Sequence, residues 1–541
     1  MKKKRKVLFF ALFFFFLIIA IEFVFLHNSR GFFWIVLEGQ IECTPKLQNK
    51  KISLEGSKDS YSVIVKGDFS RPIANVDARY ISFALDISQV VGGKWWNPKA
   101  DKAEQGSGTH TSPIFDFSCH ELDILVKELA PAYLRIGGSE ADKVYYDLQE
   151  KTTTPIPSGY HSALTKKQWD SLHSFIKRNS LGLIFTLNAG PGNRNSDGTW
   201  LPDNSEALLK YSVQCSYIID VLEFGNELNV FWYVHGRKHQ VSVEQYAKDI
   251  LAVKSLAKKH YPNVRLAVQG SAFWPVLGEP LSFFYGFTRE SIKQCGPNLD
   301  LFLWHYYPQQ SRRGPMATRR ACPGRLLSSY NLDEAAYWAL EIGNMVNQYA
   351  PGKEIWLGET GNAQFGGEPG LSDVYLASLW WMDQSGLLAK SGNKVVIRQT
   401  LSGMDYGMIE EGTWMPRPDY WCSLLWKRLM GNTVYHAHSS SSQCRVYVHD
   451  HPKQKQARSF LCINLDHQRN AIASFPEFLS CEYEIFALNS KDIFGKEILL
   501  NGQKLDKNCL ESLKKPQGKK KCSFWNTRNR TSSSFFCVYS L

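Results

Sequence analysis

Short apolar runs alternate with longer amphipathic stretches through the middle of the chain. Eight of these runs are almost continuous in Val, Ile, Leu, Phe and Trp, the pattern of strands that are buried on both faces. They cover residues 80–86, 132–136, 181–187, 218–224, 264–268, 299–304, 354–357 and 394–399. The runs are short enough to be strands, and they indicate a parallel sheet rather than an antiparallel one.

Helical periodicity fills the intervals between these runs. Ser242 precedes one amphipathic stretch, with Gln245 three residues later as a capping box, and Asp333 is expected to open another. Residues 372–390 and 419–430 are two further helix candidates. Eight strands separated by helices predict an α/β fold of the (β/α)8 TIM-barrel type over residues 76–430.

The pattern changes after Gly431. Residues 444–449, 459–464, 482–488 and 533–539 are short and alternating, and we expect antiparallel strands there. A C-terminal β-sandwich domain over residues 431–541 accounts for them. The segment 41–75 is expected to contribute to this sandwich, through a strand at residues 61–65.

The first 40 residues resemble a targeting segment. Five cationic residues at positions 2–6 precede an apolar stretch at residues 7–26, which is long enough to span a bilayer. A cleaved signal peptide and a retained signal anchor both remain open. Either one predicts export: the protein is expected to be secreted or extracellular, lysosomal, or anchored as a type II membrane protein with its catalytic domain in the lumen.

Cysteine content and charge agree with an exported protein. The twelve cysteines form no C-x-x-C pair, so scattered disulfides are expected rather than a zinc site, and Asn529 lies in a glycosylation sequon. The net charge of +12 comes from the first six residues and from the tract 504–530, which contains Lys514–Lys521. That tract is either a solvated loop or a patch for an anionic polysaccharide; nucleic acid is not expected.

Two glutamates follow predicted strands at the end where barrel enzymes carry their chemistry. Glu227 comes just after the fourth strand and Glu359 ends the seventh. Glycoside hydrolysis needs one carboxylate as nucleophile and one carboxyl group as acid/base, and a separation of roughly 5–5.5 Å gives retention of configuration. One glutamate at a strand end is usually a surface charge, but two of them, with Asn226 placed to bond a sugar 2-hydroxyl, favour catalysis.

Other polar groups follow the same strand ends. His305 and Tyr307 end the sixth strand, where either could hydrogen-bond the nucleophile. Gly366 and Gly367 could offer backbone N–H groups to a substrate carboxylate, or could form an ordinary turn. Further polar candidates are Asp86 at the end of the first strand, Arg135 at the end of the second and Tyr406 after the eighth.

Several motifs together resemble the heparanase family, glycoside hydrolase family 79. They are residues 131–138, 183–189, 225–227, 356–360, 371–373, 396–399 and 418–421. The resemblance implies a barrel with a β-sandwich and an endo-β-glucuronidase that uses no metal and no cofactor. It assigns Glu227 as acid/base and Glu359 as nucleophile, and it matches Asp86, Asn226, Tyr307, Gly366, Gly367 and Tyr406 to substrate-contacting positions.

The sequence departs from the family pattern in ways that concern the substrate. Leu228 replaces a proline, and residues 149–180 are too few for the excised linker of mammalian heparanase, which predicts a single uncut chain. Residues 273–278 replace a basic segment, and an arginine-rich loop at 312–320 could compensate for it. Leech-type hyaluronidases share residues 398–400 and 431–434. Heparan sulfate and hyaluronan both remain candidate glycosaminoglycan substrates. Exo-action and non-catalytic heparan sulfate binding remain alternatives.

Overall fold

A computed structural model describes residues 59–97, 110–149, 155–268, 270–274, 286–314, 319–466, 468–478, 482–516, 518–521 and 533–540. Its larger part is a parallel sheet in the order β11-β10-β9-β6-β3-β15-β14-β13-β12, which a β11–β13 pairing closes into a barrel. All eight predicted runs form barrel strands. Their bounds are β3 Ile81–Asp86, β6 Tyr133–Gly137, β9 Gly182–Leu187, β10 Val221–Phe224, β11 Arg265–Ala267 with β12 Ser271–Phe273, β13 Leu301–Tyr306, β14 Glu354–Thr360 and β15 Val396–Arg398.

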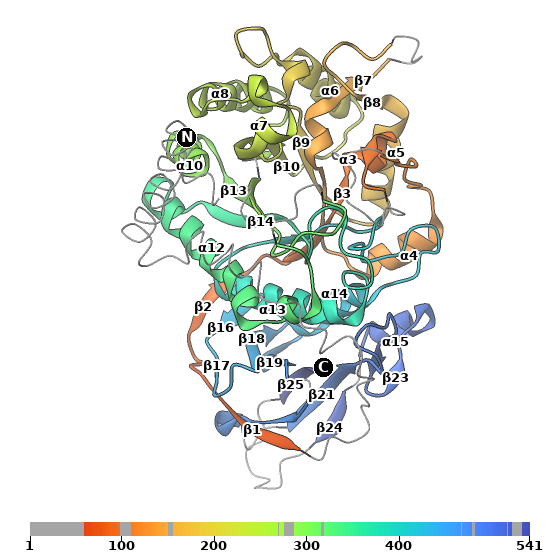
Figure 1. The fold of residues 1–541 in the computed structure, drawn as a ribbon, viewed down its shortest axis with the longest axis vertical. Coiled ribbons are helices and arrows are strands. Elements are labelled where there is room, and N and C mark those ends of the chain that lie inside the picture. The colour runs from red at the N-terminus through yellow and green to blue at the C-terminus, as the bar shows by residue number, and fades with distance from the viewer. Residues whose placement is uncertain are drawn as a thin grey trace, which may run out of the picture.

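Helices follow these strands and surround the barrel, as Figure 1 shows. The predicted helix from Asp333 begins earlier, at Ser329, because the Ser328 hydroxyl accepts the backbone N–H of Asn331 at 3.3 Å. Ser242 caps α8 through the N–H of Gln245. The surrounding helices are α4 His120–Glu128, α5 Lys166–Arg178, α6 Asp203–Gln214, α8 Val243–His260, α10 Phe287–Cys295, α12 Ser329–Tyr349, α13 Tyr375–Lys390 and α14 Pro418–Leu429.

Helix α13 is buried on almost every side, which explains why its sequence is apolar all round. One face packs on the barrel, and the other contacts the strand-rich layer drawn below it in Figure 1. Asp383 of α13 accepts hydrogen bonds from Arg445 at 2.8 Å and Tyr447 at 2.6 Å, both on β18 Cys444–His451. The helix therefore joins the two parts of the molecule through packing and through buried polar contacts.

The C-terminal layer contains two sheets, in the orders β2-β16-β18-β19-β25-β21-β22-β23 and β17-β1-β20. The predicted strands appear as β18, β19 Gln454–Asn464, β21 Glu482–Asn489 and β25 Ser533–Ser540. The expectation that they are all antiparallel was wrong, because β25 runs parallel to both β19 and β21. Between β21 and β25 the described chain forms β22 Leu499–Leu500, β23 Gln503–Lys504, α15 Leu510–Leu513 and β24 Lys519–Lys521, and such long connections permit parallel pairing.

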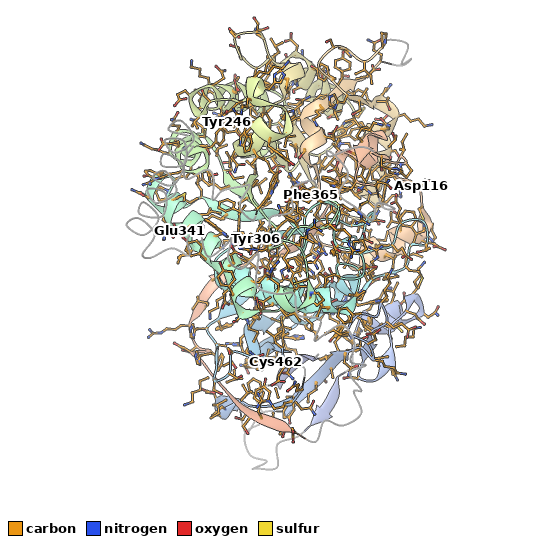
Figure 2. The ribbon with its side chains drawn as sticks, viewed as in Figure 1. Asp116, Tyr246, Tyr306, Glu341, Phe365 and Cys462 are labelled. Carbon is orange, nitrogen blue, oxygen red and sulfur yellow. The ribbon has the colours of Figure 1, made fainter. Side chains whose placement is uncertain are left out.

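The N-terminal strands belong to this C-terminal layer. Strand β1 Ser60–Lys66 pairs with β17 His438–Ser439 and with β20 Asn470–Ser474, and β2 Pro72–Asn75 pairs with β16 Thr433–Tyr435. The described chain therefore starts in one layer, forms the barrel and then returns to the first layer. Figure 2 shows Tyr246, Tyr306 and Phe365 in the barrel part and Cys462 in the strand-rich part.

Some expectations fall on other parts of the chain. The apolar stretch 7–26 and the Asn529 sequon lie outside the described residues. Among the residues that are described, no helix combines the length and apolar character needed to cross a membrane. Cys322 is bound in a disulfide, whereas Cys119, Cys215, Cys295, Cys444 and Cys509 are free thiols, so the expected scattered disulfides do not include these five.

Candidate active site

The barrel interior is filled by side chains, so polar chemistry is confined to the strand ends. Its core contains Ala84, Tyr133, Ile184, Val221, Ala267, Leu301, Leu303, Trp356, Val395 and Ile397. This is the layered packing expected inside an eight-stranded barrel. The predicted polar groups lie at the carboxyl ends of the strands, above this core.

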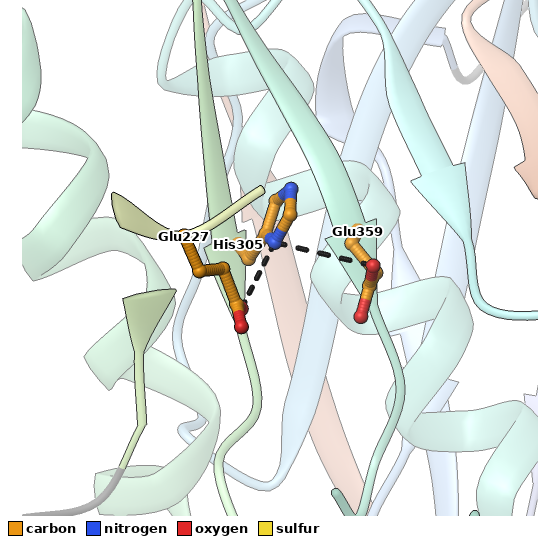
Figure 3. Close-up of side chains that lie close together, drawn as sticks. All are labelled: Glu227, His305 and Glu359. Carbon is orange, nitrogen blue, oxygen red and sulfur yellow. Dashed lines mark hydrogen bonds and ion pairs between the residues drawn. The ribbon is translucent and has the colours of Figure 1, made fainter. Parts of the chain in front are cut away.

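Glu227 and Glu359 converge at that end although 131 residues separate them in the sequence. A carboxylate oxygen of Glu227, one of Glu359 and a ring nitrogen of His305 all lie within 4.8 Å of one another (Figure 3). His305 Nδ1 is 3.0 Å from Glu227 Oε1 and 4.0 Å from Glu359 Oε2. The two glutamates are only 4% and 8% exposed, so the pair is held in a largely desolvated site.

Glu359 is held by two hydrogen-bond donors. Arg135 Nη1 donates to Oε2 at 2.8 Å, and the hydroxyl of Tyr307 donates to Oε1 at 2.6 Å. Burial, followed by the charge of Glu359, raises the pKa of Tyr307 well above its usual value, so the phenol keeps its proton. Donors on both oxygens stabilise a negative carboxylate and fix its direction, which are requirements for a nucleophile.

The surroundings of Glu227 favour its protonated form, in contrast to those of Glu359. Burial raises the pKa of its carboxyl group, and the nearby charge of Glu359 adds to the rise, although His305 and Trp274 act against it. His305 Nδ1 lies 3.0 Å from Oε1, and Trp274 Nε1 donates to the same oxygen at 3.1 Å. A carboxyl group that keeps its proton at higher pH is suited to general-acid work.

The backbone around Glu227 is unusual. Glu227 itself has φ 53°, in the left-handed region that non-glycine residues rarely adopt. Leu228, which replaces the family proline, is buried and packs so closely over Gly225 that a β-carbon there would lie 2.4 Å from its Cδ1. The departure at Leu228 therefore changes the packing under this turn and removes no polar group.

Arg135 connects several groups beneath the site. Its guanidinium bonds Glu223 at 2.8 and 3.1 Å and Asn226 Oδ1 at 2.9 Å, in addition to Glu359. Burial would raise the pKa of Glu223, but the charges of Arg135 and His305 lower it to about 2. Sequence reasoning missed Glu223, although a charged residue in an otherwise apolar strand was a visible signal.

Asp142 holds the loops after β9 and β10 together, and it was also missed. Its two oxygens accept the backbone N–H groups of Ala189 and Asn226, each at 2.8 Å. Burial raises the pKa of Asp142 to about 7, against the effect of these two donors. The Asn226 side chain accepts a hydrogen bond from Arg135 through its oxygen, so its NH2 group is not used in that contact.

The other predicted residues lie around the same pair. Burial raises the pKa of Asp86 to about 8 and that of Tyr406 well above its usual value, and the charge of Glu359 adds to both shifts. Gly366 and Gly367 have φ of 85° and 84°, and their N–H groups find no protein acceptor among the described residues. An ordinary turn and a carboxylate-binding turn both fit this geometry.

His305 lies closer to the acid/base than to the nucleophile that it was expected to bond, and its side chain is fully buried. Its Nδ1 makes its hydrogen bond to Glu227 and lies farther from Glu359. The other ring nitrogen, Nε2, lies 3.8 Å from Glu223 Oε1. His305 therefore supports the carboxyl pair from below.

Three arginines of the loop at 312–320 are paired with acidic groups. Arg312 pairs with Glu368, Arg319 with Glu334, and Arg313 with Asp405 and the carbonyl oxygen of Gly367. Arg313 and Arg319 are 3% and 1% exposed. Arg313 and Arg319 thus stabilise the loop from inside, whereas Arg312 is paired but exposed, and a substrate-binding role of this loop stays a prediction.

Glu227, His305 and Glu359 also form the one cluster in the described part of the chain whose spacing could admit a metal ion. Imidazole and carboxylate groups suit several divalent ions. However, Arg135 and Tyr307 already occupy the two oxygens of Glu359. A guanidinium so close to one ligand favours the paired carboxylate over a bound cation.

Comparison with protein families gives one match over most of the barrel. The model for the N-terminal domain of glycosyl hydrolase family 79 matches residues 61–386. Among solved structures, a family 51 α-L-arabinofuranosidase from Bifidobacterium longum superposes with a TM-score of 0.51 at 15% identity, covering 72% of this chain and 83% of that one. At this identity, the structural match speaks for the fold alone.

Three curated relatives are similar over long stretches. Heparanase-like protein 1 from Arabidopsis thaliana is 29% identical, covering 84% of this chain and 79% of that protein. Heparanase from Rattus norvegicus is 30% identical, covering 71% and 78%. Inactive heparanase-2 from Homo sapiens is also 30% identical, covering 63% and 58%.

Proposed function

The chain belongs to glycosyl hydrolase family 79, and from this membership we propose that it is a retaining endo-β-glucuronidase that cleaves glucuronic-acid linkages in a glycosaminoglycan. One observation carries the proposal: oxygens of Glu227 and Glu359 lie within 4.8 Å of each other. That separation is close to the roughly 5–5.5 Å of retaining enzymes and too short for an inverting enzyme, which must place water between its carboxyl groups.

In the first step, the Glu359 carboxylate attacks the anomeric carbon while Glu227 donates its proton to the leaving oxygen. A covalent glycosyl ester forms on Glu359, and the glycosidic bond breaks. Arg135 and Tyr307 hold the attacking carboxylate in position. The NH2 group of Asn226 would bond the sugar 2-hydroxyl, a contact that strengthens in the transition state.

In the second step, Glu227 removes a proton from water, which attacks the ester and regenerates Glu359. The charge of Glu359 contributes to the raised pKa of Glu227. Forming the ester removes that charge, so the pKa of Glu227 falls when it must act as a base. The glucuronate carboxylate would be received by the N–H groups of Gly366 and Gly367.

Reducing-end release from heparan sulfate and from hyaluronan tests the proposal. The wild-type chain should cleave at least one polymer, and Glu359→Gln should cleave neither. Activity that persists in Glu359→Gln would refute the nucleophile assignment. Product sizes from defined oligosaccharides separate endo- from exo-cleavage, and proton NMR of the first product gives the anomeric configuration.

A non-catalytic heparan sulfate-binding protein is the second candidate, because two of the relatives carry the name inactive heparanase-2. Binding would then use the basic tract near the C-terminus. Within that tract, Lys514 already pairs with Glu511 at 2.6 Å, which reduces its free charge. Tight retention on heparin without cleavage, abolished when Lys514–Lys521 are replaced by glutamine, would favour this candidate. Export of the chain stays a prediction in both cases.

A further inference from the structure

The first turn of α13 is completed by the C-terminal layer. The N-cap residue of the helix is Val374, whose side chain has no polar atom and makes no capping hydrogen bond. The first N–H groups of a helix have no acceptor within the helix and need one from elsewhere. Here the first two N–H groups of α13 donate to the carbonyl oxygens of Gly495 and Ile493, at 2.9 and 3.0 Å. These acceptors lie in residues 490–497 between β21 and β22, which we call the capping loop, so the start of α13 depends on a distant part of the sequence.

The capping loop keeps its shape through its own hydrogen bonds. Ser490 is 5% exposed, and its hydroxyl oxygen lies 2.7 Å from the carbonyl oxygens of both Asp492 and Glu497. The N–H of Gly495 donates to the carbonyl oxygen of Asp492 at 2.9 Å. Because it is closed in this way, the loop presents its carbonyl oxygens and the side chain of Lys496 to the barrel.

Lys496 forms ion pairs with two different barrel loops. Its Nζ lies 3.0 Å from Asp373 Oδ2, in the loop after β14, and 3.4 Å from Glu410 Oε1, in the loop after β15. The other oxygen of Asp373 accepts the backbone N–H of Gly370 at 2.9 Å. Asp373 is 8% exposed, so water screens its ion pair less than it screens a pair between two exposed side chains. One lysine of the C-terminal layer thus connects two loops of the barrel.

These two loops carry the Gly366–Gly367 turn and Tyr406. The carbonyl oxygen of Gly366 accepts the N–H of Asp405 at 3.0 Å. A β-carbon on Gly367 would lie 2.8 Å from the backbone nitrogen of Tyr406 and 3.0 Å from Cβ of Ser372, the residue before the acidic partner of the lysine. The glycine turn is therefore packed between the two segments that the capping loop holds.

We propose that the C-terminal layer positions the glycine turn for substrate, with Lys496 as a positioning residue that acts through Asp373 and Glu410. This inference rests on the proposed function, in which the turn receives the glucuronate carboxylate. Loss of the ion pairs lets the turn move, so that only a fraction of the molecules has the turn ready to bind. The apparent affinity falls by that fraction, whereas bound substrate restores the conformation. The value of KM should then change while kcat does not.

Lys496→Gln removes the cation and tests this role. Half-exposed ion pairs contribute modestly, so KM should rise about three- to tenfold, with kcat changed by less than about twofold. The substrates are octasaccharides of heparan sulfate and of hyaluronan, and KM is taken from each one that the wild-type chain cleaves. Lys496→Arg keeps the charge and should return KM to within about twofold of the wild-type value.

Lys259→Gln is the matched control. Lys259 is 62% exposed and pairs with the 20% exposed Glu206 at 2.7 Å, whereas the values for Lys496 and Asp373 are 50% and 10%. The control pair joins α8 to α6 and contacts neither barrel loop, so its loss should leave KM and kcat unchanged. An unchanged KM in Lys496→Gln, or a fall in kcat alone, would overturn the inference.

A second substitution, Asp373→Asn, shows whether Lys496 acts through Asp373. Asparagine removes the charge but keeps an oxygen for the N–H of Gly370. If the lysine acts through this residue, the double variant should raise KM no more than Lys496→Gln alone does, because the two changes break the same contact. Effects that multiply would show that the two residues act independently, and the proposed route would be wrong.

Hydrogen exchange separates failure of this inference from failure of the proposed function, because it needs no substrate. In Lys496→Gln, the amides of residues 366–376 should exchange about threefold faster or more, whereas Lys259→Gln should not alter them. Faster exchange without any cleavage by the wild-type chain would refute the hydrolase and keep the positioning role. Cleavage by the wild-type chain with an unchanged KM in Lys496→Gln would do the reverse. Neither cleavage nor faster exchange would overturn both.

Discussion

Gly270 lies so close to the ring of His305 that a β-carbon at position 270 would come within 1.8 Å of Nε2. This close packing holds the His305 ring beneath Glu227, where Nδ1 contacts the carboxyl oxygen Oε1. Gly270 has no positive φ, so its role is to leave space rather than to permit an unusual backbone.

Gly270→Ala should therefore displace His305 and misplace Glu227. Displacements of about 1 Å at a catalytic group can cost on the order of 10²-fold in rate, and we expect a loss of kcat of that order. Gly343→Ala in α12 is the matched control, since nothing lies within 4 Å of its β-carbon. The control should keep full activity and gain up to about 1 kcal/mol of helix stability. Equal activity in both variants would contradict the role given to His305.

Arg135→Met should destabilise the fold. The substitution leaves the buried Glu223 and Glu359 without their shared cation, and breaking a buried pair from one side costs about 3–5 kcal/mol. Thermal unfolding monitored by circular dichroism would show a lower Tm. Adding Glu223→Gln to Arg135→Met removes one of the two unpaired buried charges and should restore part of the lost stability. A double variant no more stable than Arg135→Met would show that the Glu223 pair contributes little.

The fold was largely predictable because its signals are local. Each barrel strand is buried on both faces, so each appears as an apolar run in the sequence. The parallel placement of β25 was not predictable, since it depends on the position of β25 between β19 and β21, which precede it by long connections. Pairing between distant strands leaves little trace in the alternation of one strand.

The structure brings the predicted strand-end groups together, but sequence reasoning did not find the buried groups that hold them in position. Glu227 and Glu359 were found from their position after strands four and seven together with the family motifs. Glu223, Asp142 and Trp274 were missed because each acts through a partner at least 47 positions away in sequence. Such contacts are a property of the closed barrel and appear only once its strands are assembled.

Trp274→Phe should shift the pH profile of the reaction. The protonated form of Glu227 is the acid, so kcat/KM should fall as pH rises through its raised pKa. The Trp274 N–H stabilises the ionised form, and its removal should raise that pKa further. The basic limb of kcat/KM against pH should then move to higher pH, while phenylalanine preserves the aromatic surface. A downward shift would contradict the acid role of Glu227.

Glu227→Ala should lose activity in proportion to the basicity of the leaving group. Loss of general-acid assistance costs roughly 10²–10⁴-fold for a sugar leaving group. A dinitrophenyl glycoside of a glucuronate-terminated oligosaccharide needs no proton and should form its glycosyl ester at close to the normal rate. Azide should then accelerate turnover by attacking the ester, with the β-glycosyl azide as product. Unchanged rates in azide would place the acid/base elsewhere.

The pairing of β1 and β2 with strands more than 350 positions later constrains how this protein can be shortened. A recombinant fragment that begins at the first barrel strand would leave β16 and β20 with bare edges, and exposed edges recruit other chains. Expression boundaries should for this reason start before residue 60. Conversely, residues 59–76 can be supplied as a separate peptide. Adding this peptide to the rest of the chain should then control the assembly of the whole molecule.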